Sequence, residues 1–277
     1  MTIITFISDI SYINFGIFII IFIFILSLVI FAPKSKNFYS SDIFPVVGYL
    51  HKFHNEVFIQ DLDIIKNKSI DNDDIWIKWP CDKNVINNFL VYPIFIFSTY
   101  SYKRYLLSID TMKIFKTIPN IKSIYYTKLG KNSQIKKSKK WKDVSNNTLC
   151  CMFILESPYS SDPTECCIWV NGEINPLIKN KLIIYDSSKE HSLINKTDYP
   201  VYMLTIDIKK PEEIPLGVSD ILYNSDVKDF IQTINKENIE DTQEKITRNK
   251  TKNKTKNKTK KKREKKQGKT EKKICNL

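Results

Sequence analysis

Histidine is scarce in this chain, and no two cysteines have the spacing of a common metal site. The 277 residues contain three histidines, and none lies between His54 and His191. No Cys-x-x-Cys spacing occurs, which excludes the usual zinc-binding patterns. Two pairs of cysteines are adjacent, and neighbouring residues on a strand point to opposite faces, so neither pair suits chelation of one metal. Six cysteines are too few for a disulfide scaffold, so we expect buried thiols at Cys81, Cys150, Cys151, Cys166, Cys167 and Cys275.

An excess of positive charge is also absent from most of the chain, although the net charge is +13. Residues 245–273 alone carry 16 Lys/Arg and 2 Asp/Glu, which leaves the remainder close to neutral. This tract contains tandem Asn-Lys-Thr-Lys repeats and cannot bury enough apolar surface to fold, so residues 226–277 are predicted to be a disordered, Lys-rich tail. The tract 245–273 could bind an anionic partner, either nucleic acid or lipid, or it could serve only solubility.

No lysine or arginine precedes residue 34, and residues 15–32 form an uncharged apolar run, FGIFIIIFIFILSLVIFA. At 1.5 Å per residue, a helix of this length spans roughly 27 Å, close to the hydrocarbon core of a bilayer. The run lacks a basic n-region and is followed by Pro33, so we predict a retained single-pass anchor within residues 1–36; a buried soluble helix is the alternative. Lys34 and Lys36 favour a cytosolic C-terminal domain, whereas three Asn-x-Ser/Thr triplets leave the endoplasmic reticulum lumen open.

Between the apolar run and the tail, the chain predicts one mainly β domain over residues 55–225, preceded by a stalk at 37–54. Helices are expected at Glu56–Lys66 and Tyr105–Ile118, where apolar residues follow helical spacing. Short β-type runs separated by turns are typical of a sandwich or barrel. The expected strands are 91–98, 122–128, 149–155, 166–170, 181–185 and 201–208.

His191 lies in a polar turn between the apolar runs Leu182–Tyr185 and Val201–Ile208. A histidine at the end of a strand in a barrel can serve as a metal ligand from its rim. The alternative is an ordinary hairpin with a solvated histidine. His51 and His54 lie in the predicted stalk, where we expect both to be solvated.

Residues Ile118–Pro211 resemble the aspartyl/asparaginyl β-hydroxylase family. In the closing motif, Asp186, Ser187, Glu190, His191 and Asp207 fall in step with the family. The segments that carry the resemblance are IPNIKSIYYTKLGKNSQI, LCCMFILESP, CCIWVNGE, NKLIIYDSSKEHSLINKT and VYMLTIDIKKP. The resemblance implies a double-stranded β-helix, which is a jelly-roll or cupin-like fold, with flanking N-terminal helices. It also implies iron(II) and 2-oxoglutarate as cofactors.

The residues of the implied site are mostly replaced. The family holds iron with two histidines: the second falls on His191, and the first falls on Ser138. The family positions that bind 2-oxoglutarate through arginine and histidine are Cys150, Met152 and Val201 here, and one hydroxyl contact remains as Thr127. Iron(II) and the cosubstrate are therefore implied by resemblance alone, and the site could hold neither. A lysine near the Lys136–Trp141 turn could replace a lost cation.

The sequence is compatible with three functions. The first is a membrane-anchored hydroxylase-like protein that has lost catalysis and acts as a binding module for a protein or peptide. The second is an active peptidyl-aspartyl/asparaginyl hydroxylase that uses His191 and an unusual ligand. The third is a membrane protein that recruits nucleic acid through its basic tail. Trp141 and Trp169 could line a ligand mouth or belong to the core, and Met152 and Val201 are expected to pack in the core.

Overall fold

The computed structural model describes residues 19–24, 27, 35–71, 75–80, 85–86, 88–222, 225–240 and 243. The helices are η1 (Ser41–Ile43), α2 (Pro45–Asp71), α3 (Tyr102–Leu107), α4 (Ile109–Phe115) and α5 (Lys142–Ser145), followed by a C-terminal helix over residues 225–240. The strands are β1 (Phe38–Tyr39), β2 (Ile77–Lys78), β3 (Val85–Ile86), β4 (Phe89–Ile96), β5 (Thr99–Tyr100), β6 (Ile121–Leu129), β7 (Ser133–Ile135), β8 (Thr148–Glu156), β9 (Cys166–Val170), β10 (Glu173–Pro176), β11 (Leu182–Tyr185), β12 (His191–Asn195) and β13 (Val201–Lys209).

These strands form two antiparallel sheets. The larger sheet has the order β1-β11-β8-β13-β6-β4-β2, with β5 beside β4, and the smaller has the order β10-β9-β12-β7-β3. From β6 onward the chain passes repeatedly from one sheet to the other, which is how a jelly roll is wound. The prediction of a mainly β domain is therefore confirmed, and each predicted strand run has a counterpart.

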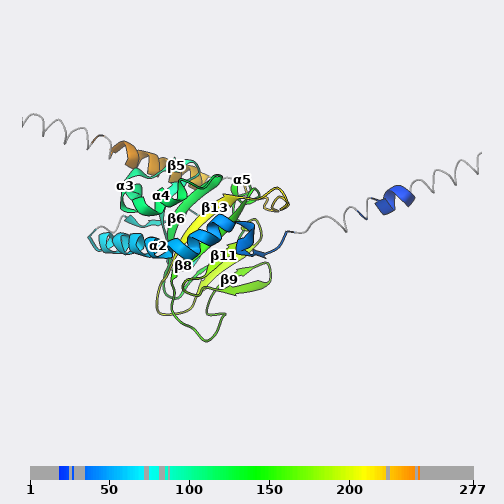
Figure 1. Cartoon of the computed structure of the whole chain (residues 1–277), viewed down its shortest axis with the longest axis horizontal. Helices are drawn as coiled ribbons and strands as arrows, with labels where there is room; N and C mark the ends of the chain where they lie inside the picture. Colours follow the sequence, from blue (N-terminus) through cyan, green and yellow to red (C-terminus); the bar gives the residue numbers. More distant parts are fainter. Residues whose placement is uncertain are drawn as a thin grey trace, which may run out of the picture.

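Two hydrophobic clusters follow from the alternation of side chains along each strand. On β8, Cys151 and Phe153 face α2 and α4 on the outer side of the large sheet. Their neighbours Cys150 and Met152 face inward, between the two sheets. The adjacent cysteines thus point to opposite faces as expected, and all four thiols on β8 and β9 are buried and free. Figure 1 shows α2 lying across the large sheet, with α3 and α4 beside it.

The folded part of the chain extends beyond both predicted boundaries. The residues expected to form a stalk, 37–54, contain β1, which pairs with β11, and the start of α2. Val47 and Leu50 in this range are buried in the core, so the stalk prediction is corrected. At the other end, the predicted tail begins with a helix over residues 225–240. Apolar side chains on this helix pack into the inner cluster, so residues 226–240 are not part of a tail.

The two helix predictions are partly right. Glu56–Lys66 lies within the much longer α2. The predicted helix Tyr105–Ile118 is divided into α3 and α4 at Ser108, whose φ of −130° and ψ of 40° are not helical. Ser108 is fully buried and its hydroxyl donates to the carbonyl of Arg104, which fixes this break.

Three predicted features lie largely or wholly outside the described residues. Of the apolar run 15–32, only residues 19–24 and 27 are described, and they are helical. No helix in the described part of the chain is both long enough and apolar enough to span a bilayer. The basic tract 245–273, Cys81 and Cys275 fall outside the described residues altogether.

Candidate functional site

A cavity of about 210 Å³ opens between the two sheets. It is bounded by inward-facing residues of both sheets and by the segment that follows β7. Its walls are mainly aromatic and aliphatic, with a few hydroxyls, two lysines and one histidine among them. The lining residues are Trp79, Phe89, Tyr125, Thr127, Ile135, Ser138, Lys139, Lys140, Trp141, Met152, Tyr185, His191, Leu193, Thr205 and Ile221.

Ser138 and His191 lie opposite each other at the wall of this cavity. They form an isolated antiparallel bridge, in which the Ser138 amide donates to the His191 carbonyl at 3.0 Å and the His191 amide donates back at 2.8 Å. Such a directly opposed pair places both side chains on the same face, about 5 Å apart at Cβ. The two positions that the family resemblance assigns to metal histidines are therefore adjacent in space.

The imidazole of His191 is held in one orientation. Its Nδ1 lies 2.9 Å from the carbonyl oxygen of Lys189, and because a carbonyl only accepts, Nδ1 carries the proton. Nε2 is then an acceptor, and His191 lines the cavity. Burial lowers the pKa of His191 to about 4, a shift that the Lys189 carbonyl opposes and the charge of Lys140 reinforces. The ring is therefore neutral at pH 7.

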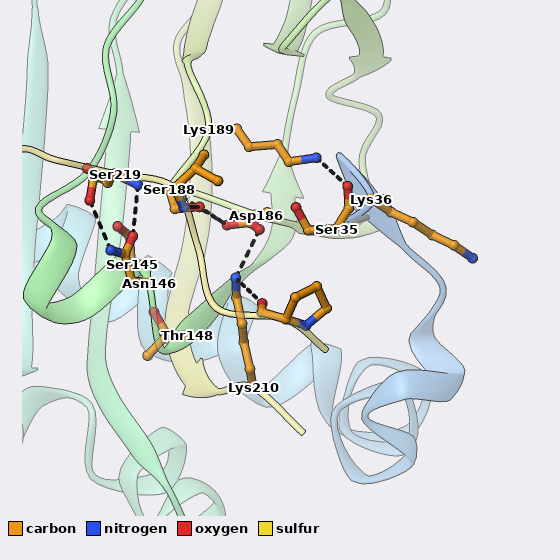
Figure 2. A network of polar contacts seen from close by, with 12 residues as sticks. Ser35, Lys36, Ser145, Asn146, Thr148, Asp186, Ser188, Lys189, Lys210 and Ser219 are labelled. Atoms are coloured by element: carbon orange, nitrogen blue, oxygen red, sulfur yellow. Dashed lines mark hydrogen bonds and ion pairs between the residues drawn. The ribbon is translucent and has the colours of Figure 1, made fainter. Parts of the chain in front are cut away.

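The turn before β12 is fixed by a buried ion pair. Asp186 accepts hydrogen bonds from the Ser188 amide at 3.0 Å and the Ser188 hydroxyl at 2.6 Å. Its other oxygen accepts from the Lys210 ammonium at 2.9 Å, and both charged side chains are almost fully buried. Figure 2 shows this network, with Lys189 reaching across to the carbonyl of Ser35. Motif residue Asp186 thus positions the turn that presents His191.

A second buried ion pair lies beside the cavity. The ammonium of Lys140 is 2.6 Å from each carboxylate oxygen of Asp207, and it also donates to the Tyr125 hydroxyl at 3.2 Å. The Ser123 hydroxyl donates to the same carboxylate. Burial alone would lower the pKa of Lys140, but the charge of Asp207, the nearby Cys150 and the hydrogen bond to Asp207 together outweigh it, and the pKa is raised. Lys140 is therefore a cation at the cavity, and its charge is already compensated.

The positions that would bind 2-oxoglutarate carry no cation. Thr127 and Met152 line the cavity, and the Thr127 hydroxyl donates weakly to the Met203 carbonyl at 3.4 Å. Cys150 and Val201 are buried within the inner cluster. Burial raises the pKa of the Cys150 thiol to about 12, so it is uncharged at pH 7. The packing role expected for Met152 and Val201 is present.

These residues do not fit iron(II) and 2-oxoglutarate as the family binds them. A serine hydroxyl is a poor substitute for an imidazole, and in the described part of the chain no three His, Cys, Asp or Glu side chains are grouped to hold a metal. The other histidines do not replace it, because both lie on α2. The ring of His51 packs against Phe153 on the outer face of the large sheet, away from His191.

Aromatic residues form much of the cavity wall, and only some of them are predicted from the sequence. Trp141 was expected either at a ligand mouth or in the core; it is buried and lines the cavity. Trp79, Tyr125 and Tyr185 were not predicted there. The inward register of β6 and β11 assigns the two tyrosines to the interior only once the pairing of the strands is known. Trp169 instead packs under the ammonium of Lys137, 3.8 Å from the ring centroid.

The fold and site define a mainly β, jelly-roll-like protein with a cavity between its sheets. The family model for aspartyl/asparaginyl β-hydroxylase matches residues 103–211, from α3 to just beyond β13. The resemblance found in the sequence is thereby confirmed over this range. A search of curated proteins finds no significant match.

Several solved structures are distantly similar to this chain. A prolyl hydroxylase from Trichoplax adhaerens, in complex with a hypoxia inducible factor peptide fragment, shares 11% identity with a TM-score of 0.40 and covers 55% of this chain and 78% of its own. A prolyl-4-hydroxylase from Pseudomonas putida shares 9% with a TM-score of 0.38 and covers 58% and 90%. A predicted oxalate decarboxylase from Thermotoga maritima shares 15% with a TM-score of 0.31 and covers 46% and 85%.

Proposed function

We propose that this protein is a membrane-anchored, aspartyl/asparaginyl β-hydroxylase-like protein that has lost the hydroxylation reaction and acts as a binding module. Its core is a double-stranded β-helix that spans residues from β6 to β13. The observation that carries the proposal is the pairing of Ser138 with His191, because only one of the two metal positions offers an imidazole. The framework around it, including Asp186 and Asp207, is fully buried and hydrogen-bonded.

The loss of the cosubstrate's partner supports the same conclusion. A desolvated carboxylate of 2-oxoglutarate needs a cation, and removing one from a buried pair costs about 2–4 kcal/mol. Cys150, Met152 and Val201 supply none. The ammonium of Lys140 is bound by both oxygens of Asp207, so pairing it with a ligand carboxylate would require breaking that contact.

The proposed anchor is the apolar run 15–32, with the folded domain on the cytosolic side. The support is the length of the run and the lysines that follow it. This places the cavity domain close to a membrane surface, since few residues separate the end of the run from β1.

Succinate release tests the proposal. The purified full chain is supplied with iron(II), ascorbate and 2-oxoglutarate, and succinate is measured with and without candidate aspartyl or asparaginyl peptides. We expect no release above a boiled control, because metal and cosubstrate are not held. Steady release that disappears in His191→Ala would overturn the proposal and establish an active hydroxylase instead.

The tract 245–273 has a second proposed role, as an electrostatic arm for an anionic partner. Its net charge of about +14 is the supporting observation, and counterion release makes such binding strongly salt-dependent. Retention on immobilised RNA or DNA should disappear on deletion of residues 245–277. Retention that persists in the deleted protein would exclude this role for the tail.

A further inference from the structure

We propose that the cavity binds a small, flat, uncharged aromatic molecule that carries one N–H or O–H donor. This inference rests on the proposed function, since it names the ligand of the proposed binding module. It differs from the family's chemistry, in which the pocket holds a metal and a dicarboxylate. Four properties of the cavity support this inference independently: its volume, its aromatic walls, its polar side chains and the charges beside it.

The walls select a flat molecule. Trp79 lies stacked between Tyr125 and Trp141, with ring centroids 5.4 and 5.8 Å apart and interplanar angles of 25° and 23°. Phe230 of the C-terminal helix packs edge-on against the same indole at 6.0 Å. A cavity wall built of aromatic rings favours an aromatic ligand, which can contact them edge-to-face or in offset stacking. The cavity of about 210 Å³ exceeds the roughly 150 Å³ that accommodates benzene in an engineered protein cavity, so a bicyclic ring fits.

Three polar side chains reach this cavity without a side-chain hydrogen bond to the described residues. They are Nε2 of His191, the hydroxyl of Ser138 and the hydroxyl of Thr205. Thr205 is only 3% exposed and lines the cavity. With Nδ1 bound to the Lys189 carbonyl, Nε2 is an acceptor. No described residue donates to this nitrogen, so a ligand N–H or O–H is the matching group.

The charges near the cavity favour an uncharged ligand. Lys140 is paired with Asp207 and hydrogen-bonded to Tyr125, so the inner part of the cavity has no uncompensated charge. Lys139 pairs with the exposed Asp220 at 3.4 Å, on the outer side. A carboxylate or ammonium entering the cavity would lose its hydration without gaining a free counter-ion, which is strongly unfavourable.

Indole and 1-methylindole form a matched pair of probes, because they differ in the N–H. We expect calorimetry on the purified full chain to show saturable one-to-one binding of indole. The N-methyl analogue should bind about tenfold more weakly, as expected for a lost buried hydrogen bond. In His191→Ala, the two affinities should become equal, while His54→Ala on α2 should keep the wild-type difference.

A cavity-filling variant supplies the second measurement. Met152→Trp should abolish indole binding, whereas Met152→Leu, which keeps the volume, should retain it; the thermal unfolding of both is measured alongside. Absence of saturable indole binding to the wild-type protein, or equal affinity for both probes, would overturn the inference even if His191→Ala fails to fold. Competition by 2-oxoglutarate with succinate release would instead overturn the proposed function, so the two failures are distinguishable.

Discussion

Ser138 and His191 exchange two backbone hydrogen bonds, of 3.0 and 2.8 Å, and project side by side into the cavity between the sheets. The backbone geometry that would present two metal ligands is thus in place, with one of the two side chains changed. His191 also keeps the orientation of a metal-ligating histidine, whose other ring nitrogen donates to a backbone carbonyl. What separates this site from a two-histidine site is chiefly the residue at position 138.

Restoring the second imidazole should therefore restore metal binding. Ser138→His places two neutral imidazoles on one face, about 5 Å apart at Cβ. We expect its affinity for Co²⁺ or Zn²⁺ to exceed that of the wild-type protein by at least about tenfold, since each added nitrogen ligand strengthens binding by a borderline-soft metal. Calorimetric titration checks this, with Ser133→His on β7 as a control that lacks the pairing to His191. Equal affinities in wild type and Ser138→His would contradict the assignment.

Acid stability should depend on His191. Its pKa is about 4 in the folded protein and about 6.5 in an unfolded chain. The unfolded chain therefore binds the extra proton, so this contribution is fully present above pH 6.5 and is lost as the pH falls to about 4. It amounts to at most about 3 kcal/mol. Nearby Lys140 lowers the pKa further, whereas Asp186 and Asp207 raise it slightly.

Urea unfolding at several pH values, with a chelator present, measures this effect. The loss of stability between pH 6.5 and 4 should be smaller in His191→Gln than in the wild type. His54→Gln should follow the wild type. Parallel curves for wild type and His191→Gln would show that the imidazole is not held neutral.

The Lys140–Asp207 pair should be far more important for stability than an exposed pair. Asp207 is fully buried, and Asp207→Asn leaves the ammonium of Lys140 without its charge partner. Removing one partner of a buried pair typically costs about 3–5 kcal/mol. The exposed Lys113–Asp110 pair is the control, and Asp110→Asn should change the free energy of unfolding far less than Asp207→Asn does. Similar effects for the two substitutions would contradict the burial of Lys140.

The helix over residues 225–240 should stabilise the domain, whereas the basic tract should not. Val227 is buried, Phe230 and Ile234 are buried in the inner cluster, and Arg104 forms an ion pair with Glu237. Each buried apolar side chain contributes about 1.5–3 kcal/mol. Deleting residues 225–277 should lower the melting temperature clearly, and deleting 245–277 should leave it unchanged. If both deletions have the same small effect, the helix does not pack as described.

The longer strands of the large sheet were predictable because most of their residues are apolar. β8 and β13 are buried on both faces, between α2 or α4 and the small sheet, so apolar residues predominate along them and few polar residues, such as Thr205 and Asp207, interrupt the pattern. The short strands β7, β10 and β12 are partly polar, and their runs resemble turns. The sequence of Leu182 to Ile208 is consequently also compatible with a hairpin. In the structure its two apolar runs flank β8, and β12 joins the other sheet.

The sequence predicts the site residues that belong to a motif. It does not predict those that reach the cavity through contacts between distant parts of the chain. The motif located His191 and its partner position Ser138, and the structure brings them together. It could not indicate that Lys140 pairs with Asp207 across 67 residues of sequence. Nor could it place Trp79, which follows the two-residue strand β2 and reaches the cavity through long-range packing. Such contacts depend on tertiary register, which one sequence does not encode as a local pattern.

One imidazole and a serine are not expected to hold the metal of a hydroxylase. Anaerobic calorimetric titration of the full chain with iron(II), in the presence of 2-oxoglutarate, tests this expectation most directly. We expect no saturable one-to-one binding in the micromolar range, and no difference between the wild type and His191→Ala. Micromolar one-to-one binding that is lost in His191→Ala would contradict it.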